Sequence, residues 1–311
     1  MSSVNPPTLS APADPARART RSAGTPGPGR GSRLIPHAAT RKVWRGVGLA
    51  LLAVIALGFV MPILWTVSTS LRTPSESFSN PPQWIPLAPV WSNYSAVFEQ
   101  VPLATFFLNS VIVTGAIVVL QLITSTMSGY AFALVRFRGK GAVFAMVLAT
   151  MMVPAQTTII PIFILIRYMG LADNLSSLIV PAIGGAFGTF LMRQYFLQMP
   201  GELAEAARVD GASNFQIFSK IYVPIALPPM ATLAVLTFSG YWNEFFRPLI
   251  FLQSTNNFTL PLGLVSLQGN FGTGSISIVL AGVVTALIPS IAIFLLAQKY
   301  FVEGITAGSF R

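Results

Sequence analysis

Six long stretches of the sequence contain no charged residue, and the length of these stretches limits what the chain can fold into. A helix needs about 20 predominantly apolar residues to cross the hydrocarbon core of a bilayer. The uncharged stretches are Gly46–Leu71, Gln100–Val135, Gly141–Ile166, Asn174–Met192, Ile221–Asn243 and Pro248–Gln298. Each of them has room for at least one membrane-spanning helix.

The last stretch is too long for one helix. Polar and glycine residues between Gln253 and Gly274 indicate a loop in its first half, which leaves a helix at about residues 277–298. The sequence therefore predicts an all-α integral membrane protein with six transmembrane helices. The predicted spans are residues 46–71, 106–133, 142–166, 175–196, 224–250 and 277–298.

Composition excludes several other classes of protein. Charged residues make up 9% of the chain, whereas they make up roughly a quarter of a soluble globular domain. An ordinary soluble enzyme is excluded, because so few charges cannot cover a water-exposed surface. There is no cysteine, and the one histidine is His37. Disulfide scaffolds and thiolate metal sites are therefore excluded, and little remains for a histidine metal site or Ser-His catalysis. We expect no enzymatic activity and no metal centre in this chain.

The distribution of Lys and Arg predicts the orientation in the membrane. With the N-terminus inside, sixteen basic residues lie on the cytoplasmic side, and only Arg72 and Arg167 lie in external loops. This bias follows the positive-inside rule and places both termini in the cytoplasm. Residues 1–42 are rich in proline and arginine and are predicted to form a disordered basic tail ahead of a transmembrane domain at 43–311. We interpret the tail as a topology determinant rather than a nucleic-acid-binding segment.

The predicted cytoplasmic loop at 199–220, between the fourth and fifth spans, has the pattern of two helices joined by a glycine. The first helix follows Pro200 and ends at Asp210-Gly211, where glycine accepts the left-handed conformation. The run Ser213 to Gln216 fits a capping box, and the second helix should end near Pro224. A slim alanine-rich helix can enter a groove on a partner protein. It can also rest on the membrane surface, and spacing alone favours that second reading.

The same loop carries a longer motif. Glu205-Ala206-Ala207 is followed by three residues and Gly211, and then by nine residues and Ile221-Tyr222-Val223-Pro224. This pattern resembles the EAA motif of binding-protein-dependent ABC importers, with Val223 in place of the family's leucine. Other stretches are similar to carbohydrate permeases of the maltose-transporter type, and the resemblance covers nearly everything after about residue 43. These stretches include NYSAVF at 93–98, SGYAFALVRFRGK at 128–140, ELAEAARVDGAS at 202–213 and YWNEFFRPLIF at 241–251.

The resemblance implies a division of labour among several subunits. A separate cytoplasmic ABC ATPase dimer would use MgATP, since this chain has no G-x-x-x-x-G-K-[ST] sequence of its own. An extracytoplasmic solute-binding protein would deliver solute, and a second homologous permease would complete a heterodimer in the bilayer. The coupling site would consist of Glu205, Ala206, Ala207, Asp210, Gly211, Ile221 and Pro224. Nucleic acid is not an expected partner.

A second group of candidate residues lies at the end of the fifth predicted span. They are candidates for the substrate pathway: Trp242 could stack on a sugar ring, Asn243 could bond its hydroxyls, and Glu244 is the third. The alternative is that Glu244 pairs with Arg247, one helical turn away. The uncharged loop from Pro248 to Ser275 would be external and, in maltose-type permeases, such a loop can reach towards the binding protein.

The leading hypothesis is a non-catalytic permease subunit of an ATP-driven importer for a sugar or oligosaccharide. The first alternative is the same architecture carrying another small polar solute. An ion-coupled secondary transporter usually needs acids within its spans, and the span interiors here offer only Glu244. A membrane-embedded enzyme would find few nucleophile–base pairs in this sequence.

Overall fold

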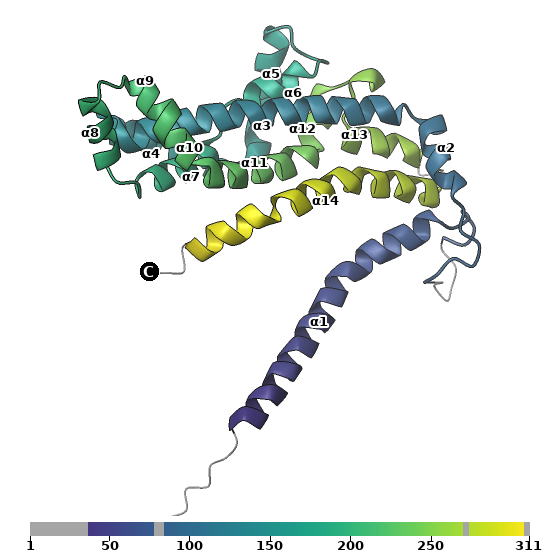
Figure 1. Ribbon diagram of the computed structural model, residues 1–311. Coiled ribbons are helices and arrows are strands. Elements are labelled where there is room, and N and C mark those ends of the chain that lie inside the picture. Colours follow the sequence, from purple (N-terminus) through teal and green to yellow (C-terminus); the bar gives the residue numbers. More distant parts are fainter. Residues whose placement is uncertain (1–36, 78–83, 270–273, 308–311) are drawn as a thin grey trace, which may run out of the picture. The chain divides into compact units, whose positions relative to one another are not determined.

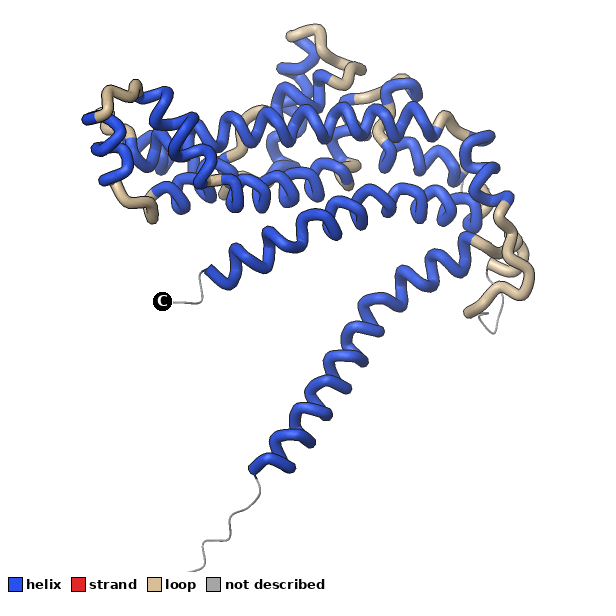
Figure 2. The backbone as a smooth tube through the Cα atoms, viewed as in Figure 1, coloured by secondary structure: helices blue, strands red, loops and turns tan. Residues whose placement is uncertain are grey.

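A computed structural model describes residues 37–77, 84–269 and 274–307 of the chain, and the side chains of 44–77, 84–269 and 274–296. The described residues form helices joined by short loops, with no strand among them (Figures 1 and 2). The predicted tail up to residue 36 and residues 78–83, 270–273 and 308–311 lie outside the described residues. The chain divides into two compact units, residues 1–57 and 58–311.

The first unit contains the N-terminal part of helix α1 (His37–Ser70). The helix begins at His37, so residues 37–42 of the predicted tail are helical. From Trp44 to Leu57 its large apolar side chains are exposed. A helix that is apolar and exposed along its length suits a lipid environment, because lipid tails cover such side chains without the cost of hydration.

The second unit is built around α3 (Leu103–Leu134), which packs against α7 (Ala186–Phe196) and α11 (Leu227–Trp242). Small residues permit this close approach. A Cβ atom on Gly188 of α7 would overlap the Ser125 side chain of α3, and one on Gly129 would overlap Met192. Small residues at helix contacts are typical of membrane bundles, where packing rather than water drives association.

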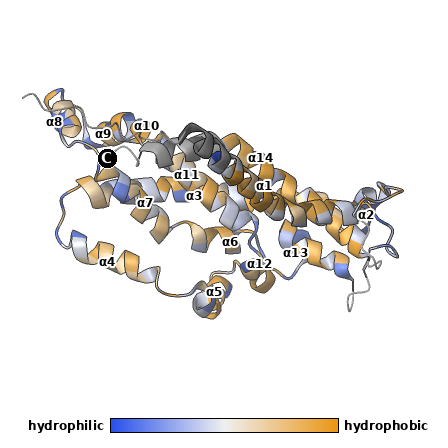
Figure 3. Ribbon diagram, turned by 90° about the horizontal axis from the view of Figure 1, so that it is seen from below, coloured by the Kyte–Doolittle hydropathy of each residue, from blue (hydrophilic) through white to orange (hydrophobic). Residues whose placement is uncertain are grey.

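Among the described residues, four helical stretches are long and apolar enough to cross a membrane, one of them Ser176–Phe196, and two bent pairs could supply two more. The predicted first span lies within α1 except for its last residue, Leu71, and the second and sixth lie within α3 and α14 (Ile276–Ala307), each a continuous helix. Apolar residues predominate along α4, α5 and α14 (Figure 3). Six spans therefore remain a prediction. The described helices supply six only if each bent pair counts as one span.

The other three predicted spans are not continuous α-helices in the structure. The third consists of α4 (Lys140–Thr150) and α5 (Ala155–Tyr168), bent by 100° at a break that contains Pro154. Proline has no N–H for the helical hydrogen bond and clashes with the preceding turn. The fourth is divided into α6 (Ser176–Ile179), the 3₁₀ turn η1 (Val180–Ala182) and α7.

The predicted fifth span, 224–250, is also interrupted. It begins in α10 (Val223–Ile225), bends by 73° before α11, leaves the helix after Trp242 and resumes as α12 (Phe246–Phe251). The bend precedes Pro228 and Pro229, in the first turn of α11, where prolines without N–H groups are tolerated. The remaining short elements are α2 (Ser92–Gln100), η3 (Thr255–Asn257), α13 (Leu260–Val265) and η4 (Ser266–Gln268).

Polar side chains of α3 support the break in the fourth span. The Gln121 amide donates to the carbonyl of Ala182 at 2.9 Å, and the Thr124 hydroxyl donates to that of Ile183 at 2.7 Å. Backbone groups released by a broken helix must find such partners, because a bilayer core offers no water. The break is therefore a supported feature of the fold. Helices α8 (Glu202–Val209) and α9 (Asn214–Ile217) lie at one end of the second unit and α2 at the other, as Figures 1 and 3 agree.

Candidate functional site

The predicted helix–glycine–helix segment is present as a defined structure, called here the α8–α10 segment (residues 202–225). Its first helix is α8 (Glu202–Val209), with Glu202 and Glu205 in the first turn and Arg208 in the last. This order places negative charge at the N-terminus and positive charge at the C-terminus, which complements the helix dipole. Glu205 and Arg208 form no ion pair with each other in the structure.

Gly211 ends α8 as the sequence predicts. Its φ is +80°, and its N–H donates to the carbonyl of Arg208 at 3.1 Å. The N–H of Ala212 donates to the carbonyl of Ala207 at 2.9 Å. Together these two bonds form a Schellman motif, which satisfies carbonyls that the helix would otherwise leave free. The hinge is therefore a hydrogen-bonded turn of fixed shape.

The second half of the segment starts with the predicted capping box. The Ser213 N–H donates to Gln216 Oε1 at 2.8 Å, and the Gln216 N–H donates to Ser213 Oγ at 3.3 Å. Helix α9 (Asn214–Ile217) continues into a π-helical turn, η2 (Phe218–Tyr222), and then into α10. A π turn is rare and occurs often at functional positions. The sequence had indicated one regular helix here, and the π turn was missed.

The inner side of the segment is packed on the bundle. Ala204 and Ala207 of α8 are buried, as are Ile217 and Tyr222, and all four belong to one apolar cluster with Met192 and Phe196 of α7. The ring of Tyr130 on α3 lies 5.3 Å from that of Tyr222. The alanines let the helix approach the core closely, because their side chains add little bulk.

The outer side of the segment is exposed and partly apolar. Val209 is 89% exposed and Phe215 is 72% exposed, on either side of the Gly211 hinge. Glu205 and Ala206 are exposed beside them. Exposed large apolar side chains grouped on one surface indicate contact with a partner or a membrane. Neither residue was a candidate from the sequence.

The structure brings together some, but not all, of the predicted coupling residues. A concave region of about 420 Å³ beneath the hinge is lined by Ala207, Asp210, Gly211 and Ile221, together with Gln216 and Lys220. Glu205 and Ala206 are exposed and are not among its lining residues, and Pro224 is exposed at the start of α10. The motif therefore contains inward residues that fix the segment and outward residues that are free for contact.

Trp242 occupies a different environment from the one that sugar stacking would require. It is 2% exposed, stacks on Phe238 with ring centroids 5.3 Å apart, and donates through Nε1 to the carbonyl of Ala286 at 3.2 Å. The ring of Phe107 lies edge-on to it at 5.7 Å. Its ring faces are thus covered in this structure, and its role is to pack α11 against α3 and α14.

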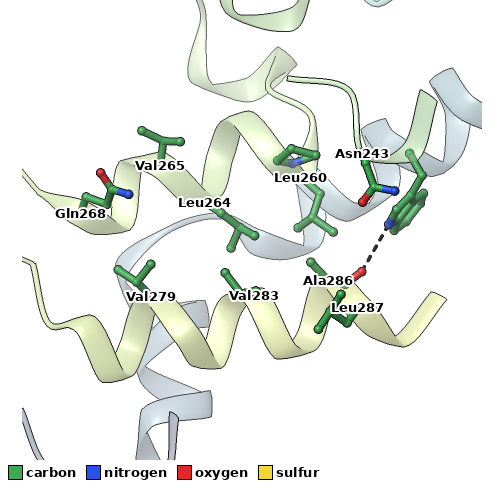
Figure 4. Close-up of a pocket in the computed structure, with 11 residues that line it drawn as sticks. Asn243, Leu260, Leu264, Val265, Gln268, Val279, Val283, Ala286 and Leu287 are labelled. Carbon is green, nitrogen blue, oxygen red and sulfur yellow. Dashed lines mark hydrogen bonds between the residues drawn. The ribbon is translucent and has the colours of Figure 1, made fainter. Parts of the chain in front are cut away.

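The edge of Trp242 and the side chain of Asn243 border a cavity of about 290 Å³ between α13 and α14 (Figure 4). Most of the lining is apolar, and Gln268 adds a second amide at its far end. Asn243 is exposed and donates to the carbonyl of Ser239 at 2.9 Å. The cavity offers few of the convergent polar groups that a polar ligand needs.

The pairing of Glu244 with Arg247 is confirmed. The guanidinium makes two hydrogen bonds with the carboxylate, and it also lies 5.0 Å from the centre of the Tyr241 ring. The Tyr241 hydroxyl in turn accepts from the Gln121 amide at 3.0 Å. This chain of contacts joins the break between α11 and α12 to α3. Glu244 is therefore engaged as the partner of an arginine, which leaves it poorly suited to bind a coupling ion.

A second polar centre was not found from the sequence. Asp173 has a φ of +55°, and its carboxylate accepts hydrogen bonds from the N–H groups of Gln253 and Ser254, both at 2.9 Å. The Ser254 hydroxyl donates to the same carboxylate, and the Asn257 amide donates to the carbonyl of Asp173 at 2.6 Å. These hydrogen bonds hold the pKa of Asp173 well below the usual value for an aspartate.

The opposite side of this loop, residues 252–258, is held by α3. The Asn109 amide donates to the carbonyls of Asn256 and Phe258 at 2.8 and 3.0 Å. The residues from Gln253 to Asn256 are exposed at its tip. In the sequence, this centre was marked only by Asp173, a single acid between two uncharged stretches. Its partners lie 80 residues away, so no local pattern connects them.

Neither polar centre has the composition of a metal site. Among the residues that the structure describes, no three acidic or histidine side chains gather closely enough to hold a metal ion. Hydrogen bonding to backbone amides, as at Asp173, satisfies a carboxylate without a cation.

Comparison with known proteins gives consistent matches over most of the chain. Residues 121–306, which include the α8–α10 segment, match the family described as "Binding-protein-dependent transport system inner membrane component". The arabinooligosaccharides transport system permease protein AraQ of Halalkalibacterium halodurans is 37% identical over 268 residues, covering 85% of this chain and 95% of that protein. AraQ of Bacillus subtilis is 33% identical over 282 residues, covering 89% of this chain and 100% of that protein.

A solved structure matches as well. A chain from the crystal structure of a bacterial ABC transporter involved in the import of the acidic polysaccharide alginate has a TM-score of 0.75 to this chain at 28% sequence identity. The match covers 89% of this chain and 100% of the other.

Proposed function

The chain belongs to the family of inner-membrane components of binding-protein-dependent transport systems, and from this premise we propose that it forms half of the translocation pathway of an ATP-driven sugar importer. A second, homologous permease supplies the other half. A cytoplasmic ATPase dimer binds and hydrolyses MgATP, and an extracytoplasmic binding protein delivers the solute. This chain contributes no catalytic group. Both of its termini lie in the cytoplasm, in agreement with the distribution of Lys and Arg.

The observation that carries the proposal is the two-sided character of the α8–α10 segment. Its inner alanines are packed on the core, while Val209 and Phe215 are exposed around a hinge of fixed shape. An exposed apolar surface on a rigid helix suits insertion into a groove of a partner protein. Because the segment leads directly into α11, a displacement of α8 by the ATPase would be transmitted to a helix that packs against α3.

A sugar or oligosaccharide is the solute that the relatives support. Their names specify arabinooligosaccharides, and the transporter of the matching structure imports alginate. Of the three residues first considered for the solute pathway, we propose that Asn243 lies nearest to the pathway, since it is exposed. Trp242 is buried, and Glu244 is paired with Arg247. Solute recognition then depends mainly on the binding protein and the second permease.

The proposal is tested at the exposed hinge surface. Val209→Asp replaces an 89% exposed apolar side chain with a charge, so the fold should be retained while contact with an apolar groove is lost. We expect uptake by reconstituted vesicles to fall at least tenfold, with binding-protein-stimulated ATP hydrolysis reduced in parallel. Val209→Ile keeps the apolar surface and should retain uptake. Normal uptake by Val209→Asp in a complex of unchanged stability would disprove the coupling role.

A further inference from the structure

A cavity of about 640 Å³ lies behind the α8–α10 segment, between this segment and the connection from α3 to α4. Arg136 of the connection and Lys140 at the start of α4 line it on one side, and Arg208, Asn214 and Tyr222 line it from the segment. Neither the coupling role proposed above nor the packing of the bundle makes use of this space. Its lining combines residues from parts of the chain that are about 70 positions apart in sequence.

The charge of the lining is predominantly positive. Arg136, Lys140 and Arg208 border the cavity, and Glu205 is the acid among the lining residues. The Lys140 ammonium is fixed in place, since it donates to the carbonyls of Ala133 and Val135 at 2.9 and 3.0 Å. Over the described residues, no hydrogen bond or ion pair is made by the guanidinium groups of Arg136 and Arg208. They therefore have donors available for an anion.

A buried polar atom in the same lining also lacks a partner. Tyr222 is fully buried, and within the described parts of the chain its hydroxyl has no hydrogen-bond partner. A buried hydroxyl without a partner is costly, and such groups are rare unless a ligand or water satisfies them. This observation is independent of the three cations, and it indicates an acceptor inside the cavity.

We propose that this cavity binds the phosphate of an anionic phospholipid headgroup. A phosphate has several oxygens that can accept from guanidinium, ammonium and hydroxyl donors at once, and arginine matches it with a two-pronged hydrogen-bonding edge. The cavity is larger than a lone phosphate requires. It also lies where α3 ends and α4 begins, at the cytoplasmic edge of the predicted bilayer. Basic pockets between helices on that side are typical sites for anionic lipid headgroups.

A headgroup in this position would join two parts of the permease. Arg208 belongs to α8, whereas Arg136 belongs to the α3–α4 connection and Lys140 is the first residue of α4. The bound phosphate would attract both sides and hold α8 close to the bundle. The cytoplasmic placement of the site rests on the proposed function, but binding itself can be measured without ATP, solute or transport.

The test compares two neighbouring arginines. Arg136 lines the cavity and Arg138 does not, although both are exposed and lie in the same connection. The assembled importer, with its ATPase subunits, is purified in detergent with phosphatidylglycerol or with phosphatidylcholine, and retained lipid is counted by native mass spectrometry. We expect the wild type and Arg138→Gln to retain phosphatidylglycerol in preference to phosphatidylcholine, and Arg136→Gln to lose it.

Four results would overturn the proposal. The first is equal retention of the two lipids by the wild type. The second is equal loss of phosphatidylglycerol from the Arg136→Gln and Arg138→Gln proteins. The third is retention only after the ATPase subunits are removed, which would mean that an acidic part of the ATPase fills the cavity. The fourth result comes from adding inorganic phosphate. If phosphate stabilised the wild type against heat but phosphatidylglycerol was not retained, the site would bind a soluble phosphate, and the lipid assignment would be overturned. None of these outcomes depends on whether Val209→Asp blocks transport.

Discussion

The α8–α10 segment and the 252–258 loop are both connections between helices, yet they are held in different ways. The loop is mostly irregular backbone, fixed by side chains from elsewhere in the chain, Asp173 and Asn109. The segment is mostly helical and makes its own backbone hydrogen bonds. It is attached to the rest of the molecule through apolar contacts, in which Ala204 and Ala207 face the core.

The difference follows from what each backbone needs. An irregular loop leaves N–H and C=O groups without partners, so polar side chains must supply them. Those bonds are directional and hold the loop in one place. A capped helix has few free groups, and its apolar contacts are not directional. We therefore expect the segment to move as a rigid body while the loop stays fixed, as the proposed coupling role requires.

The largest expected effect is at the hinge of the segment. Gly211→Pro removes the N–H that bonds to Arg208 and cannot adopt a φ of +80°, since proline fixes φ near −65°. The turn should be lost, at a cost of about 3 kcal/mol, and α8 should no longer lie correctly on the core. We expect uptake in reconstituted vesicles to be abolished.

Gly139 provides a matched control for this variant. Its φ is +77° and, as at Gly211, no atom lies within 4 Å of the position of a Cβ. Gly139→Ala and Gly211→Ala should each cost about 1–2 kcal/mol of strain. Only the Gly211 variant should impair uptake substantially. Equal impairment by both would mean that general strain, and not the shape of the segment, limits transport.

A smaller effect is expected where the segment meets the core. Ala207 is buried and Ala206, beside it, is exposed. Ala207→Leu overfills the contact and should lower the free energy of unfolding by about 1–3 kcal/mol, with reduced uptake. Ala206→Leu should leave the thermal midpoint unchanged, and any loss of uptake would then report on the outer surface alone. A similar fall in the midpoint for both variants would contradict the inner and outer assignment.

The 252–258 loop should tolerate single substitutions better than the segment does, because several hydrogen bonds hold it in place. Asp173→Asn keeps an acceptor but loses the charge, so each hydrogen bond weakens and the total loss is about 1 kcal/mol, reduced further by solvent. We expect the apparent KM for binding-protein-delivered solute to rise, while the maximal rate and basal ATP hydrolysis are retained. Glu99→Gln is the control, since Glu99 is exposed and its carboxylate makes no hydrogen bond to the described residues. A fall in maximal rate with unchanged KM would argue against a positioning role.

The two regions also differ in how much of them could be predicted from sequence. The α8–α10 segment was predicted in outline, including the stop at Gly211 and the capping box at Ser213, because caps and turns are determined by residues a few positions apart. The division of its residues into buried and exposed was not predicted, since it depends on contacts with α7 and α3. The π turn at 218–222 was missed for the same reason.

The 252–258 loop was predicted only as a loop. Its partners, Asp173 and Asn109, are distant in sequence, and no periodicity links them. The broken third, fourth and fifth spans teach a related lesson. Hydropathy indicates which residues enter the bilayer, but not whether a helix continues through them. That depends on prolines such as Pro154 and on distant donors such as Gln121, which satisfy the backbone at the break.

The smallest effect that we expect is on pH dependence: as the pH falls, the 252–258 loop should lose protection from hydrogen exchange before the α8–α10 segment does. The pKa of Asp173 is lowered in the folded protein, so its contribution to stability is complete above the usual aspartate value and is lost as the pH falls through the lowered value. Protection of the loop from hydrogen exchange should therefore be constant between about pH 5 and pH 7, where aspartates stay ionised. Below about pH 4, hydrogen exchange corrected for its intrinsic rate should increase in residues 252–258 of the wild type. The Asp173→Asn variant should not show this acid-induced increase.

Gly211 and its neighbours are held by uncharged backbone bonds, so exchange in the α8–α10 segment should not follow the same titration. If both regions lost protection at the same pH and to the same extent in Asp173→Asn, the loop would owe its fixed position to something other than the ionised carboxylate.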